Sequence, residues 1–418
     1  MSINAHIEHI FRNEYGVLVS ILVRQFGLQQ LSSAEDAVQW SLAQALEKWP
    51  RTGKPDKPAA WLFKVAQRFL LTELRQKTAR RIEVNQYDEL QSDYNSDQHA
   101  QALSGELKDA LLRMLFVACD DSIPIESQLV FTLKCLCGFS IKEVSLRLFI
   151  SEANVYKRFS RAKRALADLP IDIMELPDDD IGSRLGSVLR VLYLLFTEGY
   201  LSSSEDAAIR QELCKDALRL TVLISQSRYG STPVVSALIA LMYFNIARID
   251  SRINELGLVL LEQQARESWD QQMIAQALIY LERSAKGNTL SRYHVEAGIA
   301  AEHCLAQSFE QTRWDKIATS YQLLESITGS PLLLLNRAIA TAEWKTPQHG
   351  LVILESANLP TWLQKSYLWH AVSADLQFRS NQNLRAIKNA DMAIQAAPSQ
   401  AIKQALQSRF NNLKNNQR

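Results

Sequence analysis

Apolar residues recur at helical spacing along nearly the whole chain. From Phe11 through Leu18 to Phe26 they return every three or four positions, and the same period runs through most later segments. The strict alternation typical of strands is absent, and glycine is sparse, with 14 in 418 residues. We therefore predict an all-α fold.

Changes in composition divide the chain into three helical blocks, residues 1–81, 105–169 and 181–418. Acidic, polar stretches at 82–104 and 170–180 separate these blocks and are typical of linkers. In the first block, Ser32 or Ser33 is expected to cap a second helix that Trp49-Pro50 should end. A third helix is expected over residues 59–78.

The most informative segment is FSIKEVSLRLFISEANVYKRFSRAKRAL, residues 139–166. It predicts two short helices joined by a tight turn, with Ser151 as the N-cap of the second. Val155, Phe159, Ala162 and Leu166 then share one face, and the basic side chains point elsewhere. This is the helix-turn-helix layout of DNA-binding proteins. The alternative is an ordinary amphipathic helix with a solvated basic face.

Composition limits what else the chain can be. Apolar residues make up 47%, enough for real cores, and the net charge is +1, so nucleic-acid binding must come from local patches. Five scattered cysteines indicate reduced thiols, and the Cys135–Cys137 pair lacks partners at metal-ligand spacing. No phosphate-binding loop or catalytic cluster is visible. We expect no enzyme activity, cofactor or metal.

The membrane signals are weak. The longest apolar stretch, Val234 to Ala247, is interrupted by polar residues and suits a buried helix better than a bilayer span. The N-terminus lacks the basic region and long apolar core of a signal peptide. We expect a soluble, cytoplasmic protein without a membrane partner.

Several motifs together resemble an extracytoplasmic-function RNA polymerase sigma factor of the sigma-70 family. AEDAVQWSLAQALEKWP looks like the family's second conserved region, PAAWLFKVAQRFLLTELRQ its promoter-melting segment, and residues 139–166 its fourth region. LYLLFTEGYLSSS and SRYHVEAGIAAEHC resemble the carboxy-terminal extension of the subgroup with a tetratricopeptide-like domain. Residues 367–398 look like one tetratricopeptide unit, a helix pair with a period of about 34 residues.

The resemblance implies two partners, the core of bacterial RNA polymerase and promoter DNA, and an activity in starting transcription. It also implies a regulatory role for the carboxy-terminal block, which would bind a regulator or act as one. By position the resemblance assigns polymerase docking to Glu35, Asp36, Gln39 and Trp40. It assigns contact with the −10 element to Trp61, Lys64, Gln67, Arg68 and Arg75. Contact with the −35 element falls to Glu152, Asn154, Lys157, Arg158, Arg161, Lys163 and Arg164.

Some of these assignments have simpler explanations. Glu35 and Asp36 also favour a helix N-terminus, and Trp61 is equally suited to a core. The sequence departs from the family at Arg68, Thr72 and Glu73, where Asn, Asp and Arg are usual, so the −10 preference is open.

Two other functions fit parts of the chain. One is a helix-turn-helix transcriptional regulator with a helical-repeat sensor that acts without polymerase. The other is a protein-interaction scaffold. The first block distinguishes them from a sigma factor, because neither needs the AEDAVQ helix followed by WLFKVAQR.

Overall fold

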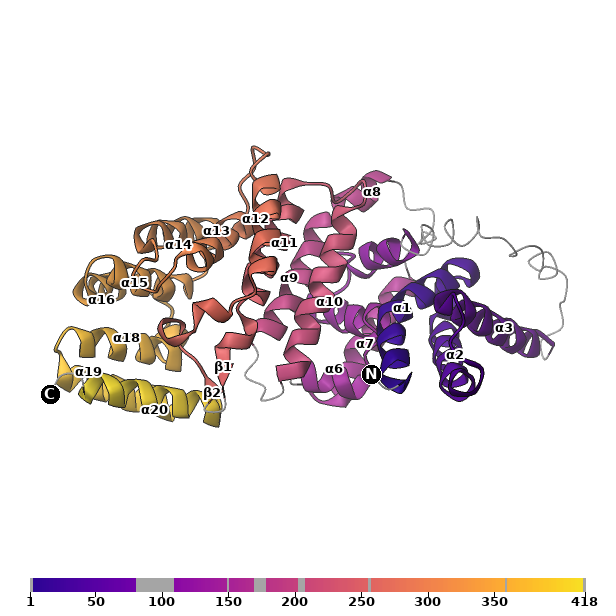
Figure 1. The fold of residues 1–418 in the computed structure, drawn as a ribbon, viewed down its shortest axis with the longest axis horizontal. Helices are drawn as coiled ribbons and strands as arrows, with labels where there is room; N and C mark the ends of the chain where they lie inside the picture. Colours follow the sequence, from indigo (N-terminus) through magenta and orange to yellow (C-terminus); the bar gives the residue numbers. More distant parts are fainter. Residues whose placement is uncertain are drawn as a thin grey trace. The chain divides into compact units, whose positions relative to one another are not determined.

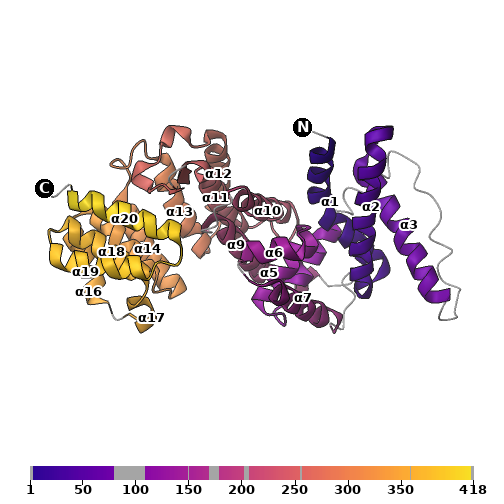
Figure 2. The same ribbon diagram turned by 90° about the horizontal axis from the view of Figure 1, so that it is seen from below.

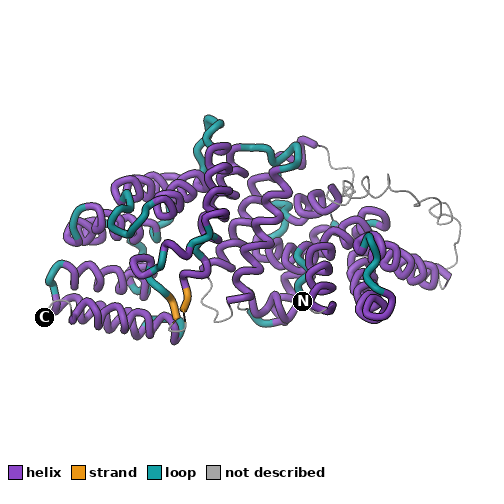
Figure 3. The backbone as a smooth tube through the Cα atoms, in the orientation of Figure 1, coloured by secondary structure: helices purple, strands orange, loops and turns teal. Residues whose placement is uncertain are grey.

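The computed structural model describes residues 3–79, 109–148, 150–168, 178–201, 207–254, 257–357 and 359–415. They form two compact units, Met1–Leu195 and Phe196–Arg418, and the division falls inside helix α9 (Leu185–Leu201). The predicted all-α fold is confirmed (Figure 1). One small correction applies, an antiparallel pair of two-residue strands, β1 (Ile253–Asn254) and β2 (Gly257–Leu258), orange in Figure 3. Strands this short carry no alternating pattern.

The first unit combines three long helices with several shorter ones. Residues 109–118 are helical but carry no label in Figure 1, and two irregular turns join the others, the 3₁₀ turn η1 (Leu28–Gln30) and the π-helical turn η3 (Thr132–Leu136). The other helices of this unit are α1 (Ile3–Phe26), α2 (Leu31–Thr52), α3 (Pro58–Ala79), α5 (Ile125–Phe131), α6 (Ile141–Leu148), α7 (Glu152–Ala167), α8 (Asp178–Ser183) and the start of α9.

Helices α1, α2 and α3 pack together through the apolar stripes that the sequence predicts. Leu18 and Leu22 of α1, Val38 of α2 and Leu62 and Leu70 of α3 are buried. The helix ends differ in part from prediction: α2 begins at Leu31 without a side-chain cap and continues past Pro50 to Thr52. Pro50 removes one backbone hydrogen bond and its ring crowds the carbonyl of Leu46, and the helix ends two residues later.

Helix α1 also packs against η3, and a glycine makes this contact possible. A Cβ atom placed on Gly16 would lie 2.2 Å from the carbonyl oxygen of Leu136. At the end of the same turn, Gly138 has φ +75° and packs its backbone on the Tyr15 ring. Backbone therefore meets backbone at this point, and any larger residue would push α1 away from η3.

The first residues of the third predicted block belong to the first unit. Arg184 pairs with Asp120 at 2.7 Å, and the Ser187 hydroxyl donates to Asp121 at 2.6 Å. Burial alone would raise the pKa of Asp120, but hydrogen bonds from Ser122 and the charge of Arg184 outweigh it, so the pKa is lowered. The Asp120 carboxylate is thus held in its charged form beside Arg184.

The predicted acidic linkers fall mainly outside the described residues. This holds for all of 82–104 and for 170–177, while residues 178–180 form the start of α8. The boundaries of these linkers remain predictions.

The second unit is a succession of helix pairs. Helix α11 (Pro233–Ile246) contains the buried stretch that the sequence predicts. The other helices are α10 (Ala207–Ser225), α12 (Gln271–Ser284), α13 (Arg292–Leu305), α14 (Trp314–Thr328), α15 (Leu333–Trp344), α16 (Pro347–Ser356), α17 (Thr361–Gln364), α18 (Tyr367–Arg379), α19 (Asn383–Gln395) and α20 (Gln400–Asn415), with 3₁₀ turns η4 (Ile249–Arg252), η5 (Leu261–Gln263) and η6 (Arg266–Ser268).

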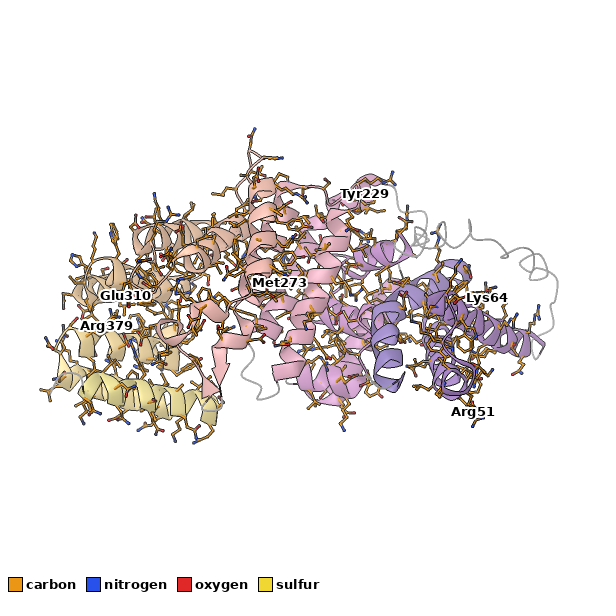
Figure 4. All side chains as sticks on the ribbon, viewed as in Figure 1. Arg51, Lys64, Tyr229, Met273, Glu310 and Arg379 are labelled. Atoms are coloured by element: carbon orange, nitrogen blue, oxygen red, sulfur yellow. The ribbon has the colours of Figure 1, made fainter. Side chains whose placement is uncertain are left out.

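The last three helices share one small core. Small residues, Ala374 of α18 and Ala386, Ala390 and Ala393 of α19, let these helices approach closely, and Phe410 of α20 closes the cluster. The three helices lie side by side in the yellow part of Figure 2. Arg379, labelled in Figure 4, ties α18 to α15 through Glu343 at 2.6 Å.

The contact between α1 and η3 gives a direct stability prediction. We expect Gly16→Ala to destabilise the first unit by about 2 kcal/mol, because the new methyl group collides with a backbone carbonyl. Gly186→Ala in α9 is the control, since open space surrounds that position and alanine favours a helix. Urea unfolding followed by circular dichroism measures both, and equal stability of the two variants would contradict the close packing.

Candidate nucleic-acid interface

Helices α6 and α7 form the predicted helix-turn-helix, and Ser151 caps α7 as predicted. The Asn154 N–H donates to the Ser151 hydroxyl at 3.3 Å, which fixes the start of α7. A reciprocal pair starts α6: the Ser140 N–H donates to the Glu143 carboxylate at 2.8 Å, and the Glu143 N–H donates to the Ser140 hydroxyl. The apolar face of α7 is buried as predicted: Val155, Phe159, Ala162 and Leu166.

The opposite face of α7 is exposed and positively charged. Phe159 stacks on Phe131 of α5 with ring centroids 5.9 Å apart, and this holds the helix with its basic face outward. Arg158 and Lys163 are half-buried. The remaining residues predicted for −35 contact are exposed: Glu152, Asn154, Lys157, Arg161 and Arg164. Such a face has the charge and hydrogen-bond donors to follow a DNA groove.

Lys163 has a partner inside the unit. Its ammonium group donates to the Ser32 hydroxyl and lies 5.5 Å from the centroid of the Phe159 ring. In this arrangement Lys163 joins α7 to the start of α2. It is therefore less available to a phosphate than the exposed Arg161.

A second basic face lies on α3. Lys64, Arg68 and Arg75 are exposed and follow one another at helical spacing, so they share one side of the helix. Figure 4 labels Lys64 on this helix. Gln67 is half-buried and donates to the Gln25 side chain at 3.1 Å.

The two tryptophans predicted to carry function pack against aromatic rings. Trp61 is half-buried, with its ring edge-on to Trp49 and the ring centroids 5.4 Å apart. Trp40 stacks on Phe69 of α3 at 5.4 Å, yet 47% of it is exposed. Each therefore helps to fix α2 on α3 and still offers part of its surface to another molecule.

The residues predicted for polymerase docking separate into two environments. Asp36, Gln39 and Trp40 lie together on the exposed side of α2. Glu35 points the other way and is only 5% exposed. Its carboxylate pairs with Lys134 of η3 at 2.6 Å, with both side chains largely shielded from solvent.

Two further groups donate to the Glu35 carboxylate. They are the Tyr15 hydroxyl at 3.4 Å and the Cys135 thiol at 3.7 Å. Burial first, and then the charge of Glu35, raise the pKa of both groups, so each keeps its proton. This cluster could not be predicted from the sequence, because Lys134 stands 99 residues from Glu35.

The described part of the chain contains neither a candidate metal site nor a candidate membrane span. Within it, no group of three or more His, Cys, Asp or Glu side chains is arranged to hold a metal ion. All five cysteines are free thiols. No described helix has both the length and the apolar character needed to cross a bilayer.

Comparison with known proteins divides the chain in the same way as its helices. Residues 10–80 match the family described as sigma-70 region 2, and residues 114–166 match sigma-70 region 4. Residues 184–285 match a family of unknown function, DUF6596. The two sigma-70 matches contain α2, α3, α6 and almost all of α7, which carry the residues described above.

One curated relative is similar over most of the chain. It is a protein of Rhizobium meliloti (strain 1021), named only as an uncharacterized protein, and it is 34% identical over 339 residues. The match covers 80% of this chain and 79% of the relative. No solved structure gives a significant match.

The buried pair makes a double-mutant prediction. Lys134→Met leaves the Glu35 carboxylate buried without its cation, and we expect a loss of about 3 kcal/mol in the free energy of unfolding. In a Glu35→Gln background the same change should cost far less, because no charge is left unpaired. Urea unfolding of the wild type, both single variants and the double variant measures the coupling.

Lys142→Met is the matched control for this cycle, since Lys142 is an exposed lysine on α6. It should change stability by less than about 0.5 kcal/mol in either background. Equal costs of Lys134→Met in both backgrounds would show that the pair does not hold the unit together.

Proposed function

We propose that this chain, which carries sigma-70 regions 2 and 4, is an alternative sigma factor of the extracytoplasmic-function class. It would bind the core of bacterial RNA polymerase and direct it to promoters. The observation that carries the proposal is the pair of sigma-70 regions, in order, each ending in a helix with an exposed basic face. Only residues 81–113 lie between the two matches, which suits a class without a third region.

The proposed roles follow the outward faces of α7 and α3, whose residues are exposed apart from the half-buried Arg158 and Trp61. We assign −35 recognition to α7, with Glu152, Asn154 and Arg158 at base edges and Lys157, Arg161 and Arg164 at phosphates. We assign the −10 element to the face of α3 that carries Lys64, Arg68 and Arg75, where the partly open ring of Trp61 is suited to stacking on an unpaired base.

Polymerase docking is assigned to Asp36, Gln39 and Trp40 of α2. Their exposure supports this, and a tryptophan that is half exposed and flanked by polar groups is typical of an interface anchor. Glu35 takes part only if its pair with Lys134 opens. Polymerase binding would then compete with the contact between α2 and η3.

The rival functions explain less of the chain. A helix-turn-helix regulator that acts without polymerase needs no region 2, yet residues 10–80 match that region. A scaffold needs no exposed basic face on α7.

The carboxy-terminal unit is proposed to be tetratricopeptide-like and regulatory. Helix α15 begins at residue 333 and α18 at residue 367, 34 residues later, which equals the period of such repeats. Both begin helix pairs, α15 with α16 and α18 with α19. Stacked pairs of this kind commonly present a protein-binding surface.

We expect the purified chain to bind core RNA polymerase and to produce discrete transcripts from genomic DNA. Arg161→Gln should reduce transcript yield at all of these promoters alike and should flatten the salt dependence, because it removes one phosphate contact. Sequencing of transcript ends and pull-down on core enzyme are the measurements.

Lys388→Gln is the control for charge, since Lys388 is exposed on α19 of the second unit. It should leave transcript yield unchanged. Failure of the wild-type chain to bind core enzyme would overturn the sigma-factor proposal, whatever its affinity for DNA.

A truncated chain tests the regulatory role, provided that the truncation leaves the packing of the first unit intact. A chain of residues 1–201 keeps α9 whole together with the partners of Asp120 and Asp121. We expect it to bind core enzyme while its transcript yield differs at least several-fold from that of the full chain. Equal yields and equal promoter choice would contradict a regulatory role for the second unit.

A further inference from the structure

Arg248 is a buried cation without a matching acceptor. It lies just after α11 and is only 8% exposed. Its Nε atom is buried and has no hydrogen-bond partner, and no ion pair to Arg248 exists among the described residues. Burying a guanidinium group without an anion is costly, so such groups are normally paired.

A second arginine contacts the same aromatic ring. The Arg248 guanidinium is 4.9 Å from the centroid of the Trp269 ring, and that of Arg266 is 5.0 Å from it. Burial first, and then the charge of Arg248, lower the pKa of Arg266. The fold thus holds two positive charges against one indole.

The hydrogen-bond acceptors of Arg266 are neutral oxygens, which satisfy its donors without cancelling its positive charge. It donates to the carbonyls of His303 and Ala306 at 2.7 and 2.9 Å, and to the Thr312 hydroxyl at 3.1 Å. These carbonyls lie at the C-terminal end of α13, where the helix dipole favours a cation. Arg266 therefore has a structural role of its own, whereas the guanidinium of Arg248 contacts the Trp269 ring and acts electrostatically on the neutral Tyr321 and Cys304 side chains.

Among the described residues the neighbouring titratable groups give Arg248 no ion pair, although the exposed Glu310 acts on Arg266. His303 is buried, and burial together with Arg248 and Arg266 lowers its pKa to about 3, so it is neutral at physiological pH. The nearby acids are engaged or solvent-facing: Glu296 pairs with Arg292 at 2.7 Å, and Glu310 is exposed. Two guanidinium groups on one ring, one of them with an unsatisfied Nε donor, form a site whose charge and donors suit an oxyanion.

We propose that Arg248, supported by Arg266 and Trp269, binds the oxyanion of a small ligand, a phosphate or a carboxylate. A guanidinium group presents parallel N–H donors that match two oxygens of either group. The Trp269 ring fixes both arginines in place before the ligand arrives. This site would give the second unit a chemical input, and it does not depend on the proposed role in transcription.

The test uses the full chain and the variant Arg248→Met, unfolded by heat in sodium phosphate, sodium acetate or sodium chloride at equal ionic strength. A ligand at ten times its dissociation constant shifts the folding equilibrium of the wild type about elevenfold. We expect phosphate or acetate to raise the melting temperature of the wild type more than that of Arg248→Met. A response to only one of them identifies the chemical group.

The behaviour in chloride separates binding from packing. If Arg248 is an anion-binding residue, Arg248→Met should be at least as stable as the wild type in chloride, because the substitution removes an unpaired buried charge. Arg283→Gln is the matched control, since Arg283 also lies over an aromatic ring, that of Tyr280 at 5.0 Å, but is exposed. It should keep the full wild-type response to the anions.

Two results would overturn the proposal. In the first, neither anion stabilises the wild type more than it stabilises Arg248→Met. Any rise in melting temperature in phosphate would then come from its general exclusion from the protein surface. In the second, Arg248→Met melts lower than the wild type by the same amount in all three salts. Arg248 would then serve only to pack on Trp269.

Discussion

The buried pair of Glu35 and Lys134 is the interaction on which the first unit depends. It joins helices from the two sigma-70 regions, which the sequence separates by almost a hundred positions. Removing both charges from water is costly, and their attraction offsets that cost only while the geometry holds. The Gly16 contact supplies the geometry, because α1 can reach η3 only where no side chain intervenes. Loss of either partner therefore costs more than the intact pair contributes, because it leaves an unpaired charge between these helices.

The helices and their buried faces could be predicted from the sequence because they arise from local periodicity. Val155, Phe159, Ala162 and Leu166 are buried as their spacing requires, and Ser151 caps α7. The end of α2 was predicted less well. Pro50 was expected to stop it, but the stop comes only at Gly53, with φ +82°.

What the sequence could not reveal are pairings between distant positions. Glu35 and Asp36 are adjacent acids on α2 and were given the same role, yet one is buried and the other exposed. Periodicity places Glu35 on the inner side of α2, but only the fold brings Lys134 to it. Arg248 is a similar case, since nothing in its neighbourhood in the sequence distinguishes it from a solvated arginine.

The pair of Arg184 and Asp120 shows that family boundaries and packing boundaries differ in this chain. The stretch that matches the family of unknown function begins at residue 184, yet its first turns complete the unit that carries both sigma-70 regions. If recombination replaced this extension from residue 184 onward, Asp120 and Asp121 would lose the partners that they have in Arg184 and Ser187. We therefore expect Asp120 and Asp121 to change together with Arg184 and Ser187 in related chains.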